Sequence, residues 1–243
     1  MNDDIELLVE RDADSLAAAV ADQLVSSIAA LQAQGHVPSI VLTGGTIAGS
    51  VHRMVAARSD DRVDWTRVEL FWGDERFVPA DSGERNERQA REALLDHVGV
   101  DASRVHPMPA DDGTVSLETA AAAYADEVRD RGFDIVMLGV GPDGHVASLF
   151  PGKPSLTVVD HDTIAEADSP KPPPSRISLT FAALNRGREV WLLVSGEGKA
   201  DAVASAIGTG DVTATPAAGV RGTEQTLWML DEGAASRLPP DMR

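Results

Sequence analysis

Hydrophobic residues recur along the chain in two alternating patterns, one with helical spacing and one in short continuous runs. Residues 14–35 place Leu, Val and Ile three or four positions apart, with Asp14 as a capping residue at the start and Gly35 at the end. Residues 39–43 form a β-branched run that stops at a pair of glycines. The pattern predicts an amphipathic helix, then a strand, a glycine turn and a second helix over residues 46–57.

The same alternation continues through most of the chain. The expected strands cover residues 68–72, 133–138, 189–194 and 226–230, and the expected helices cover residues 84–98, 117–131 and 200–207. Continuous apolar runs of this kind are typical of parallel strands that are buried on both faces. We therefore predict an α/β fold, a three-layer Rossmann-like single domain over residues 1–243 with a mostly parallel sheet.

Residues 151–180 depart from this pattern, because prolines interrupt the segment repeatedly. Residues 156–159 and 176–179 are its strand candidates, and we expect this part to be antiparallel and rich in loops. The chain has only three lysines among its 21 cationic residues. Two of them, Lys153 and Lys171, lie in proline-rich loops and are expected to be solvated linker charges.

Composition narrows the class of protein and of partner. The chain has 243 residues, 43% of them hydrophobic, no cysteine and a formal net charge of −18. Such an acidic chain repels a polyanion, so we expect no nucleic-acid partner and no acidic membrane surface. The absence of cysteine fits a reducing compartment. The acidic N-terminal segment and the lack of a continuous apolar run of about 18 residues argue against a signal sequence or membrane span. We predict a cytoplasmic protein, a monomer or weak homodimer.

The turn after the first predicted strand is a candidate anion site. In open α/β sheets, ligands bind beyond the carboxyl ends of the strands. Gly44, Gly45 and Thr46 follow such a strand and open a helix. The first amides of a helix have no partner within it, so a phosphate group can bind there with the Thr46 hydroxyl. A tight turn that needs glycine for its backbone conformation is the alternative interpretation.

The second strand end carries charged side chains. Asp74, Glu75 and Arg76 follow residues 68–72 on a predicted loop. A carboxylate here can hold a sugar hydroxyl or transfer a proton, and the guanidinium can bind phosphate. A surface ion pair between neighbours is the alternative.

The third strand end holds the main catalytic candidate. Gly139, Gly141 and Gly144 fit the spacing of a dinucleotide-binding loop, but residues 145–150 allow fewer than two helical turns before a proline, so we exclude that function. We expect the glycines to let the backbone approach another ligand. His145 is then the candidate general base. Asp143 can either orient the imidazole or cap the short helix.

The remaining histidines and cations have more limited predicted roles. His161 lies between two aspartates, but side chains alternate along a strand, so a metal site there would need ligands from elsewhere. We predict no metal ion and no cofactor. Arg76, Arg176 and Lys199 are the cations near presumed strand ends, and an acidic protein that binds an anion must concentrate cations at the site.

Several of these motifs, in this order, resemble the glucosamine-6-phosphate isomerase/6-phosphogluconolactonase family. The resemblance covers about residues 7–230. It rests on V-L-T-G-G at 41–45, W-G-D-E-R-F-V-P at 72–79, Asn86, G-P-D-G-H-V-A-S-L-F-P at 141–151, R-I-S-L-T at 176–180 and S-G-E-G-K-A at 195–200. It implies the Rossmann-like fold shared by glucosamine-6-phosphate deaminase and ribose-5-phosphate isomerase. The implied activity is metal-free hydrolysis of 6-phospho-D-glucono-1,5-lactone in the oxidative pentose phosphate pathway.

The resemblance also assigns roles to individual residues. His145 is implied as the catalytic base and Asp74 as a group that holds or polarises the sugar ring. Phosphate and sugar oxygens are implied to bind Gly44, Gly45, Thr46, Arg76, Arg176 and Lys199. Two positions depart from the family pattern. Thr46-Ile47-Ala48 replaces Ser-Thr-Pro but keeps a hydroxyl, and Arg85, which replaces Ser, adds a cation or faces water.

For such a reaction we expect His145 to take a proton from water as the water attacks C1. Amides of the loop from Gly141 to Gly144, or an arginine, are the expected oxyanion donors. Two other functions stay open. One is an amino-sugar phosphate deaminase/isomerase on the same fold, and the other is a non-catalytic sugar-phosphate sensor.

Overall fold

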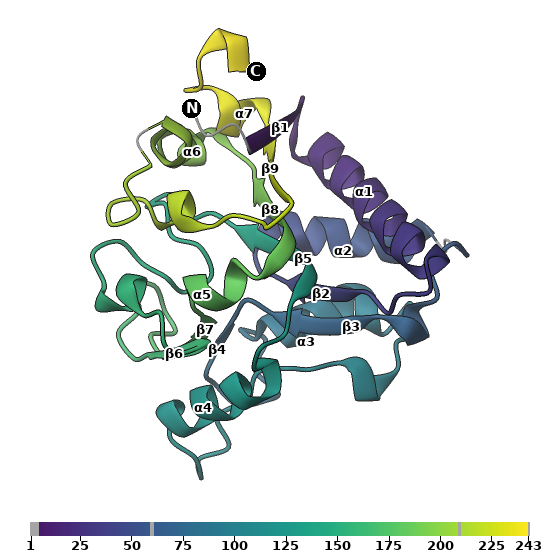
Figure 1. Ribbon diagram of the computed structural model, residues 1–243, viewed down its shortest axis with the longest axis vertical. Coiled ribbons are helices and arrows are strands. Elements are labelled where there is room, and N and C mark those ends of the chain that lie inside the picture. The colour runs from purple at the N-terminus through teal and green to yellow at the C-terminus, as the bar shows by residue number, and fades with distance from the viewer. Residues whose placement is uncertain (1–4, 59–60, 209, 243) are drawn as a thin grey trace.

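The main sheet has six strands, all parallel, in the order β1-β9-β8-β5-β2-β3. The computed structural model describes residues 5–58, 61–208 and 210–242. The strands are β1 (Ile5–Glu10), β2 (Ser39–Leu42), β3 (Glu69–Trp72), β5 (Phe133–Gly139), β8 (Gly187–Val194) and β9 (Gln225–Asp231). Helices lie on both sides of the sheet (Figure 1). The predicted α/β class and mostly parallel sheet are confirmed, and β1 is a strand that the sequence pattern did not reveal.

A second, smaller sheet pairs its strands antiparallel in the order β4-β7-β6. The strands are β4 (Asp74–Arg76), β6 (Thr163–Glu166) and β7 (Arg176–Leu179). The antiparallel character expected of the proline-rich segment is therefore confirmed. The strand expected at residues 156–159 is wrong, because Pro154 opens a 3-10 turn (Pro154–Thr157) and the side chain of Val159 lies 82% exposed, with no strand to cover it.

Helices cover the main sheet in two groups. They are α1 (Ala13–Ala33), α2 (Thr46–Arg58), α3 (Asn86–Ala90), α4 (Leu117–Val128), α5 (Phe181–Leu184), α6 (Ala200–Gly208) and α7 (Glu232–Ala235). The expected helix over residues 84–98 is shorter and continues as a π-helical turn (Arg91–Leu95). Short 3-10 turns lie at Trp65–Arg67, Ala102–Arg104, Pro154–Thr157, Glu197–Lys199, Pro216–Gly219 and Pro240–Met242. Figure 1 shows α1 beside α2 on one side, with the small sheet, α4 and α5 on the other.

Helix α1 begins two residues before the expected start. Asp12, rather than Asp14, caps the helix, because its carboxylate accepts a hydrogen bond of 2.8 Å from the amide of Ser15. Among the described helices, α1 alone is long and apolar enough to cross a membrane by length and composition, a property that core helices of soluble proteins share. Residues such as Leu16 and Val20 are fully buried, so its apolar face packs into the core.

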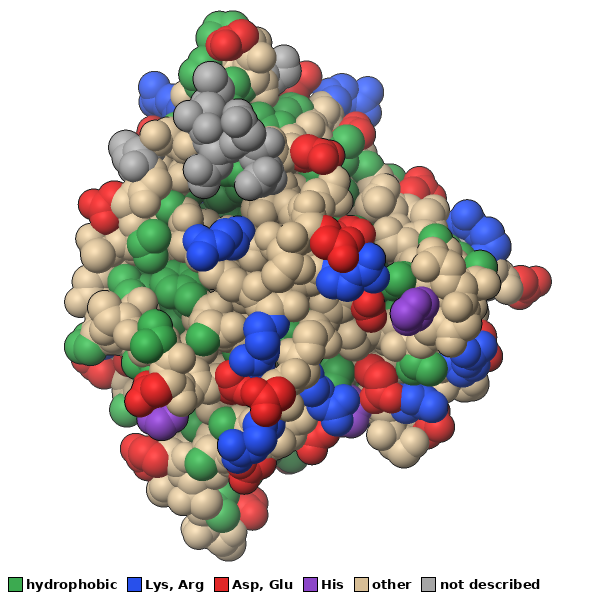
Figure 2. Space-filling view, viewed as in Figure 1, with side chains coloured by type: hydrophobic (Ala, Val, Ile, Leu, Met, Phe, Trp, Pro, Cys, Tyr) green, Lys and Arg blue, Asp and Glu red, His purple; other side chains and the backbone are tan. Residues whose placement is uncertain are grey.

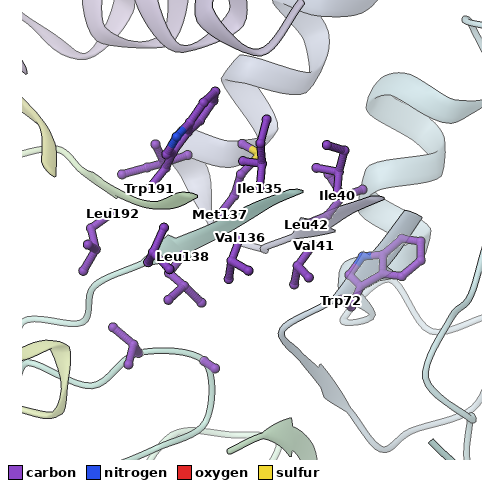
Figure 3. Packing of buried hydrophobic residues seen from close by; sticks show 14 of the residues in the cluster. Ile40, Val41, Leu42, Trp72, Ile135, Val136, Met137, Leu138, Trp191 and Leu192 are labelled. Atoms are coloured by element: carbon purple, nitrogen blue, oxygen red, sulfur yellow. The ribbon is translucent and has the colours of Figure 1, made fainter. Parts of the chain in front are cut away.

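The core is built from strands that are buried on both faces. Ile40, Ile135 and Trp191 point to one side of the sheet, whereas residues at the alternating positions of the strands, such as Val136, point to the opposite side (Figure 3). Burial of one such large side chain stabilises the fold by about 1.5 to 3 kcal/mol relative to leaving it exposed. Apolar packing on both faces therefore fixes the positions at which these strands end.

The order of the strands identifies where a ligand should bind. After β2 the chain moves outward to β3, then returns to the other side of β2 as β5 and continues through β8 to β9. The direction of winding reverses between β2 and β5. A crevice opens at such a reversal, beyond the carboxyl ends of the strands. The turns after β2 and β5 should therefore face a common cavity.

Candidate active site

A cavity of about 580 Å³ lies at this reversal. One wall comes from the turns after β2, β5 and β8, which we call the parallel-sheet wall. The other comes from β4, β7 and residues 167–175, which we call the small-sheet wall. Eight of the nine predicted site residues line the cavity: Gly44, Gly45, Thr46, Asp74, Arg76, His145, Arg176 and Lys199. The ninth, Asp143, contacts His145 directly.

In the turn after β2, a glycine packs closely against a neighbouring side chain and the next residues begin a helix. A Cβ atom on Gly44 would lie 2.0 Å from Oδ1 of Asn86, so only glycine fits beside that buried amide. Gly45 has a φ of 100°, a conformation that favours glycine. Thr46 then begins α2, whose thirteen residues direct the positive end of the helix dipole at the cavity. The turn has the backbone geometry of an anion site.

The turn after β5 holds a histidine and an aspartate in contact. Nδ1 of His145 lies 2.5 Å from Oδ1 of Asp143. A Cβ atom on Gly141 would lie 1.9 Å from the same Nδ1, so this glycine makes room for the imidazole, and the backbone of Gly139 and Gly141 also lines the cavity. The segment contains turns and no helix, so the expected short helix is wrong and Asp143 has no helix to cap.

The contact between Asp143 and His145 determines which ring nitrogen faces the cavity. Burial alone would raise the pKa of Asp143, but the hydrogen bond and charge of His145 and the charge of Lys171 outweigh it and lower the pKa. An ionised carboxylate accepts a hydrogen bond, so we assign the proton of the neutral imidazole to Nδ1. Nε2 is then unprotonated and can accept a proton.

Lys171 is a neighbour of His145 that the sequence did not reveal. Its Nζ lies 3.2 Å from Nδ1 of His145, and it lines the cavity. The expectation that Lys171 is a solvated linker charge is therefore wrong. The same holds for Lys153, whose Nζ lies 3.3 Å from the buried carboxylate of Glu166. Prolines carry no periodic signal, so no pattern in the sequence indicated which way these side chains point.

Asp74 lies in a network of hydrogen bonds on the small-sheet wall. Its side chain accepts a bond of 2.6 Å from the Ser148 hydroxyl and one of 3.4 Å from the amide of Asn86. Nη1 of Arg176 lies 3.7 Å from the same carboxylate. Asp74 is 7% exposed and lines the cavity, so a carboxylate that is almost fully buried faces any ligand bound there.

Glu75 points away from Asp74, as alternation along a strand requires. It is fully buried and accepts hydrogen bonds from the amides of Arg76, Asn86 and Glu87 at 2.7 to 2.8 Å. Burial raises its pKa, opposed by the nearby charge of Arg85 and by these amides. Glu75 therefore joins β4 to α3, and the alternative of a surface ion pair is wrong.

Arg85 adds a cation to a buried carboxylate rather than to the cavity, and it does not face water. It is 3% exposed, its Nη2 donates to the carbonyl of Met108 at 2.7 Å, and the same nitrogen lies 3.7 Å from Glu75. Arg85 does not line the cavity. This departure from the family pattern gives the buried carboxylate below the site a cationic partner.

The three predicted cations differ in how much of each side chain is free for a ligand. Arg176 donates three hydrogen bonds to the carbonyls of Lys171, Pro172 and Pro173, at 3.0 to 3.3 Å. Burial lowers the pKa of Arg176 and that of Lys199, and Lys171 lowers that of Lys199 further. Nε of Arg76 is buried without a hydrogen-bond partner. Arg176 therefore supports residues 171–173 as well as facing the cavity.

Charge is mixed rather than segregated on the outer surface. On the face shown in Figure 2, Lys and Arg side chains lie among acidic ones, although the chain as a whole carries a net charge of −18. Within the described residues, no group of three or more His, Asp or Glu side chains is placed to hold a metal ion. His161 is 71% exposed, and its nearest carboxylate, that of Asp160, is 3.7 Å away.

Comparisons with known proteins show which family this chain resembles. Residues 11–228 match the family described as Glucosamine-6-phosphate isomerases/6-phosphogluconolactonase. A 6-phosphogluconolactonase of Mycobacterium tuberculosis is 48% identical over 238 residues, covering 94% of this chain and 96% of the relative.

Solved structures give the same result for the fold. A 6-phosphogluconolactonase from Thermotoga maritima superposes with a TM-score of 0.80 at 30% identity, covering 93% of this chain and 98% of the other. A monomeric glucosamine-6-phosphate deaminase superposes with a TM-score of 0.81 at 18% identity, covering 96% and 99%. At that identity the deaminase is similar in fold alone.

Proposed function

This chain belongs to the glucosamine-6-phosphate isomerase/6-phosphogluconolactonase family, and we propose that it hydrolyses 6-phospho-D-glucono-1,5-lactone to 6-phosphogluconate with His145 as the general base. The observation that carries this proposal is the contact between Asp143 and His145, at a cavity that also contains the start of α2 and four cations. The walls of the cavity come from residues 13 to 199, which supports one catalytic unit.

The base acts on water. With its proton held on Nδ1 by Asp143, His145 presents Nε2 to a water molecule and takes a proton as the oxygen of that water attacks C1 of the lactone. The ring C–O bond then breaks, and the imidazolium returns the proton to the ring oxygen. General-base catalysis of this kind contributes roughly 10²- to 10⁴-fold. A lactone is an activated ester, so no acyl-enzyme is required.

The phosphate group binds the turn after β2. The amides that begin α2 and the hydroxyl of Thr46 surround that position, and Arg76 lines the same part of the cavity. Backbone amides at a helix start favour a phosphate both through their unused donors and through the helix dipole. Asp74, opposite, is placed to accept a sugar hydroxyl proton in a hydrogen bond.

The oxyanion formed at C1 requires donors other than the glycine amides that we expected. The amide of Gly141 donates to the carbonyl of His145, and the amide of Gly144 donates to that of Gly141, each at 2.9 Å. Both are therefore engaged within the loop. An arginine of the cavity is therefore the remaining expected donor, and one well-placed donor of this kind contributes about 3 kcal/mol to stabilising the transition state.

A lactone-decay assay in EDTA tests the proposed reaction. The lactone is generated from glucose 6-phosphate by a dehydrogenase, its formation is stopped, and its disappearance is followed with and without the protein. We expect faster decay that persists in EDTA and returns to the spontaneous rate in the His145→Ala variant. Decay at the spontaneous rate with the unmodified protein would contradict the proposal. Release of ammonia from glucosamine 6-phosphate would instead indicate the deaminase, and binding of 6-phosphogluconate without turnover would indicate a sensor.

The partner is accordingly a small anionic sugar phosphate, and we propose that the enzyme acts in the cytoplasm as a monomer or weak homodimer. The absence of cysteine is compatible with a reducing compartment.

A further inference from the structure

We propose that Lys171 is a positioning residue for lactone hydrolysis, whose charge holds Asp143 ionised and keeps His145 in the neutral, proton-accepting form. This inference rests on the proposed function. It starts from three atoms that lie together: Nδ1 of His145, Oδ1 of Asp143 and Nζ of Lys171. The distance from Nζ to Nδ1 is 3.2 Å, and the distance from Nζ to Oδ1 is 3.5 Å.

The loop that carries Lys171 is held in place at its backbone. The amide of Lys171 donates to the hydroxyl of Ser169 at 3.2 Å, and that hydroxyl donates to the carbonyl of Lys171 at 3.0 Å. The same carbonyl accepts a bond of 3.1 Å from Arg176, which is itself 5% exposed. A lysine on a freely moving loop would lose its charge interaction to solvent, so this anchoring is what lets the ammonium act on the imidazole.

The chemistry of the three groups limits what Lys171 can do. An ammonium has no lone pair and an Nδ1–H is a donor, so Lys171 cannot form a hydrogen bond with Nδ1, and Asp143 remains the acceptor for the Nδ1 proton. Its effect on the ring is electrostatic. A carboxylate alone would favour the imidazolium, which cannot accept a proton from water, and a nearby positive charge opposes that protonation.

The other charges that face His145 around the cavity are Asp74 and Arg76 on β4, Arg176 on β7 and Lys199 after β8. Asp143 lies on the same turn as His145. Of the cations that line the cavity, Lys171 is the one that contacts both members of the pair. An anionic substrate entering the cavity would promote protonation of His145 unless a charge at this position offset it.

The test is a pH titration of the His145 ring by NMR in protein labelled with ¹³C-histidine, with His145→Gln used to assign the signal among the six histidines. In Lys171→Met, loss of the positive charge makes protonation easier. We therefore expect the ring to titrate about one pH unit higher than in the unmodified protein. The acid-side fall of kcat/KM for the lactone should move by the same amount. Lys171→Arg keeps the charge and should stay within about 0.3 pH unit of the unmodified protein.

Lys153→Met is the matched control, because Lys153 is a lysine of the same proline-rich segment that pairs with Glu166 and does not line the cavity. It should leave the titration unchanged. Lys171→Gln is a second neutral variant to use if Lys171→Met does not fold.

An unchanged titration in the neutral variants would overturn the inference, as would an equal change in Lys171→Arg or Lys153→Met. The NMR measurement needs no lactone. Failure of the proposed function, seen as no lactone turnover by the unmodified protein, is therefore distinguishable from failure of this inference.

Discussion

The two walls of the cavity use different means to meet a charged substrate. The parallel-sheet wall presents backbone at its glycine turns, with Gly44 and Gly45 at the start of a helix and Gly141 beside His145, and adds the side chains of His145 and Lys199. The small-sheet wall presents charged side chains that are themselves buried, among them Asp74 and Arg176. Backbone groups are fixed by apolar packing of the strands, whereas buried charges are fixed by their partners. A single substitution should therefore act through a lost charge partner on the small-sheet wall and through backbone position or close packing on the parallel-sheet wall.

The largest loss of stability is expected for a substitution below the small-sheet wall. In Glu75→Ala, three amide donors and the guanidinium of Arg85 lose their buried acceptor. Removing one partner from a buried charged pair costs about 3 to 5 kcal/mol, and the free energy of unfolding measured by urea denaturation should fall by that amount.

Glu92→Ala is the control for this loss, because Glu92 is exposed and pairs with Arg88, four residues earlier on the surface. Its unfolding free energy should hardly change. Equal losses in the two variants would mean that burial of the charge is not what holds this wall.

A slightly smaller change in stability, one that depends on pH, is expected behind the parallel-sheet wall. His52 lies within α2, is 2% exposed, and burial lowers its pKa to about 4, with the charge of Arg53 contributing. In the unfolded chain the imidazole titrates near 6.5, so the native state is favoured while His52 is neutral. This stability is complete above pH 6.5 and is lost as the pH falls toward 4, by about 3 kcal/mol.

The measurement for His52 compares unfolding free energies at pH 7 and pH 4. In His52→Leu the decrease between these values should be about 3 kcal/mol smaller than in the unmodified protein, because no buried group there gains a proton. His161→Gln, at an exposed histidine, should retain the full decrease. An unchanged pH dependence in His52→Leu would show that His52 is not the group responsible.

The smallest of the stability effects separates two roles of glycine on the parallel-sheet wall. Gly44→Ala would place a Cβ atom 2.0 Å from Asn86, whereas Gly45→Ala meets no atom within 4 Å but forces a side chain onto a φ of 100°. Each should cost about 1 to 3 kcal/mol. Only Gly44→Ala should displace Asn86, which is bonded to Asp74, and so raise KM together with lowering kcat.

A crystal structure of the Gly44→Ala variant would check the displacement. If Asn86 stayed in place, Gly44 would not be required for close packing against Asn86. The distinction from Gly45, which is required for its backbone conformation, would then be lost.

The sequence predicted the parallel-sheet wall better than the small-sheet wall. The strands before Gly44 and Gly141 are continuous apolar runs, and a strand that is buried on both faces must deliver the next few residues to the sheet edge. His145 could be found for that reason alone. Lys171 and Arg85 could not, because their positions depend on contacts with distant elements and their neighbouring sequence has no period.

The same limit explains the errors in the proline-rich segment. The antiparallel character was predictable from the repeated prolines. The strand, however, lies at Thr163–Glu166, where its partner β7 can pair with it, and not at residues 156–159. Pairing between strands is a property of the folded chain. A short apolar run without a turn signal does not determine it.

The most direct test of the account is the kinetics of Asp143→Asn, because the two walls meet at His145 and Asp143 is held to fix its proton on Nδ1. An asparagine amide directed at Nδ1 would donate to it and move the imidazole proton to Nε2, which then cannot accept a proton from water. We predict that kcat for the lactone falls by roughly 10²-fold or more, while KM changes by less than about threefold. A variant with unchanged kcat would contradict His145 as a base oriented by Asp143.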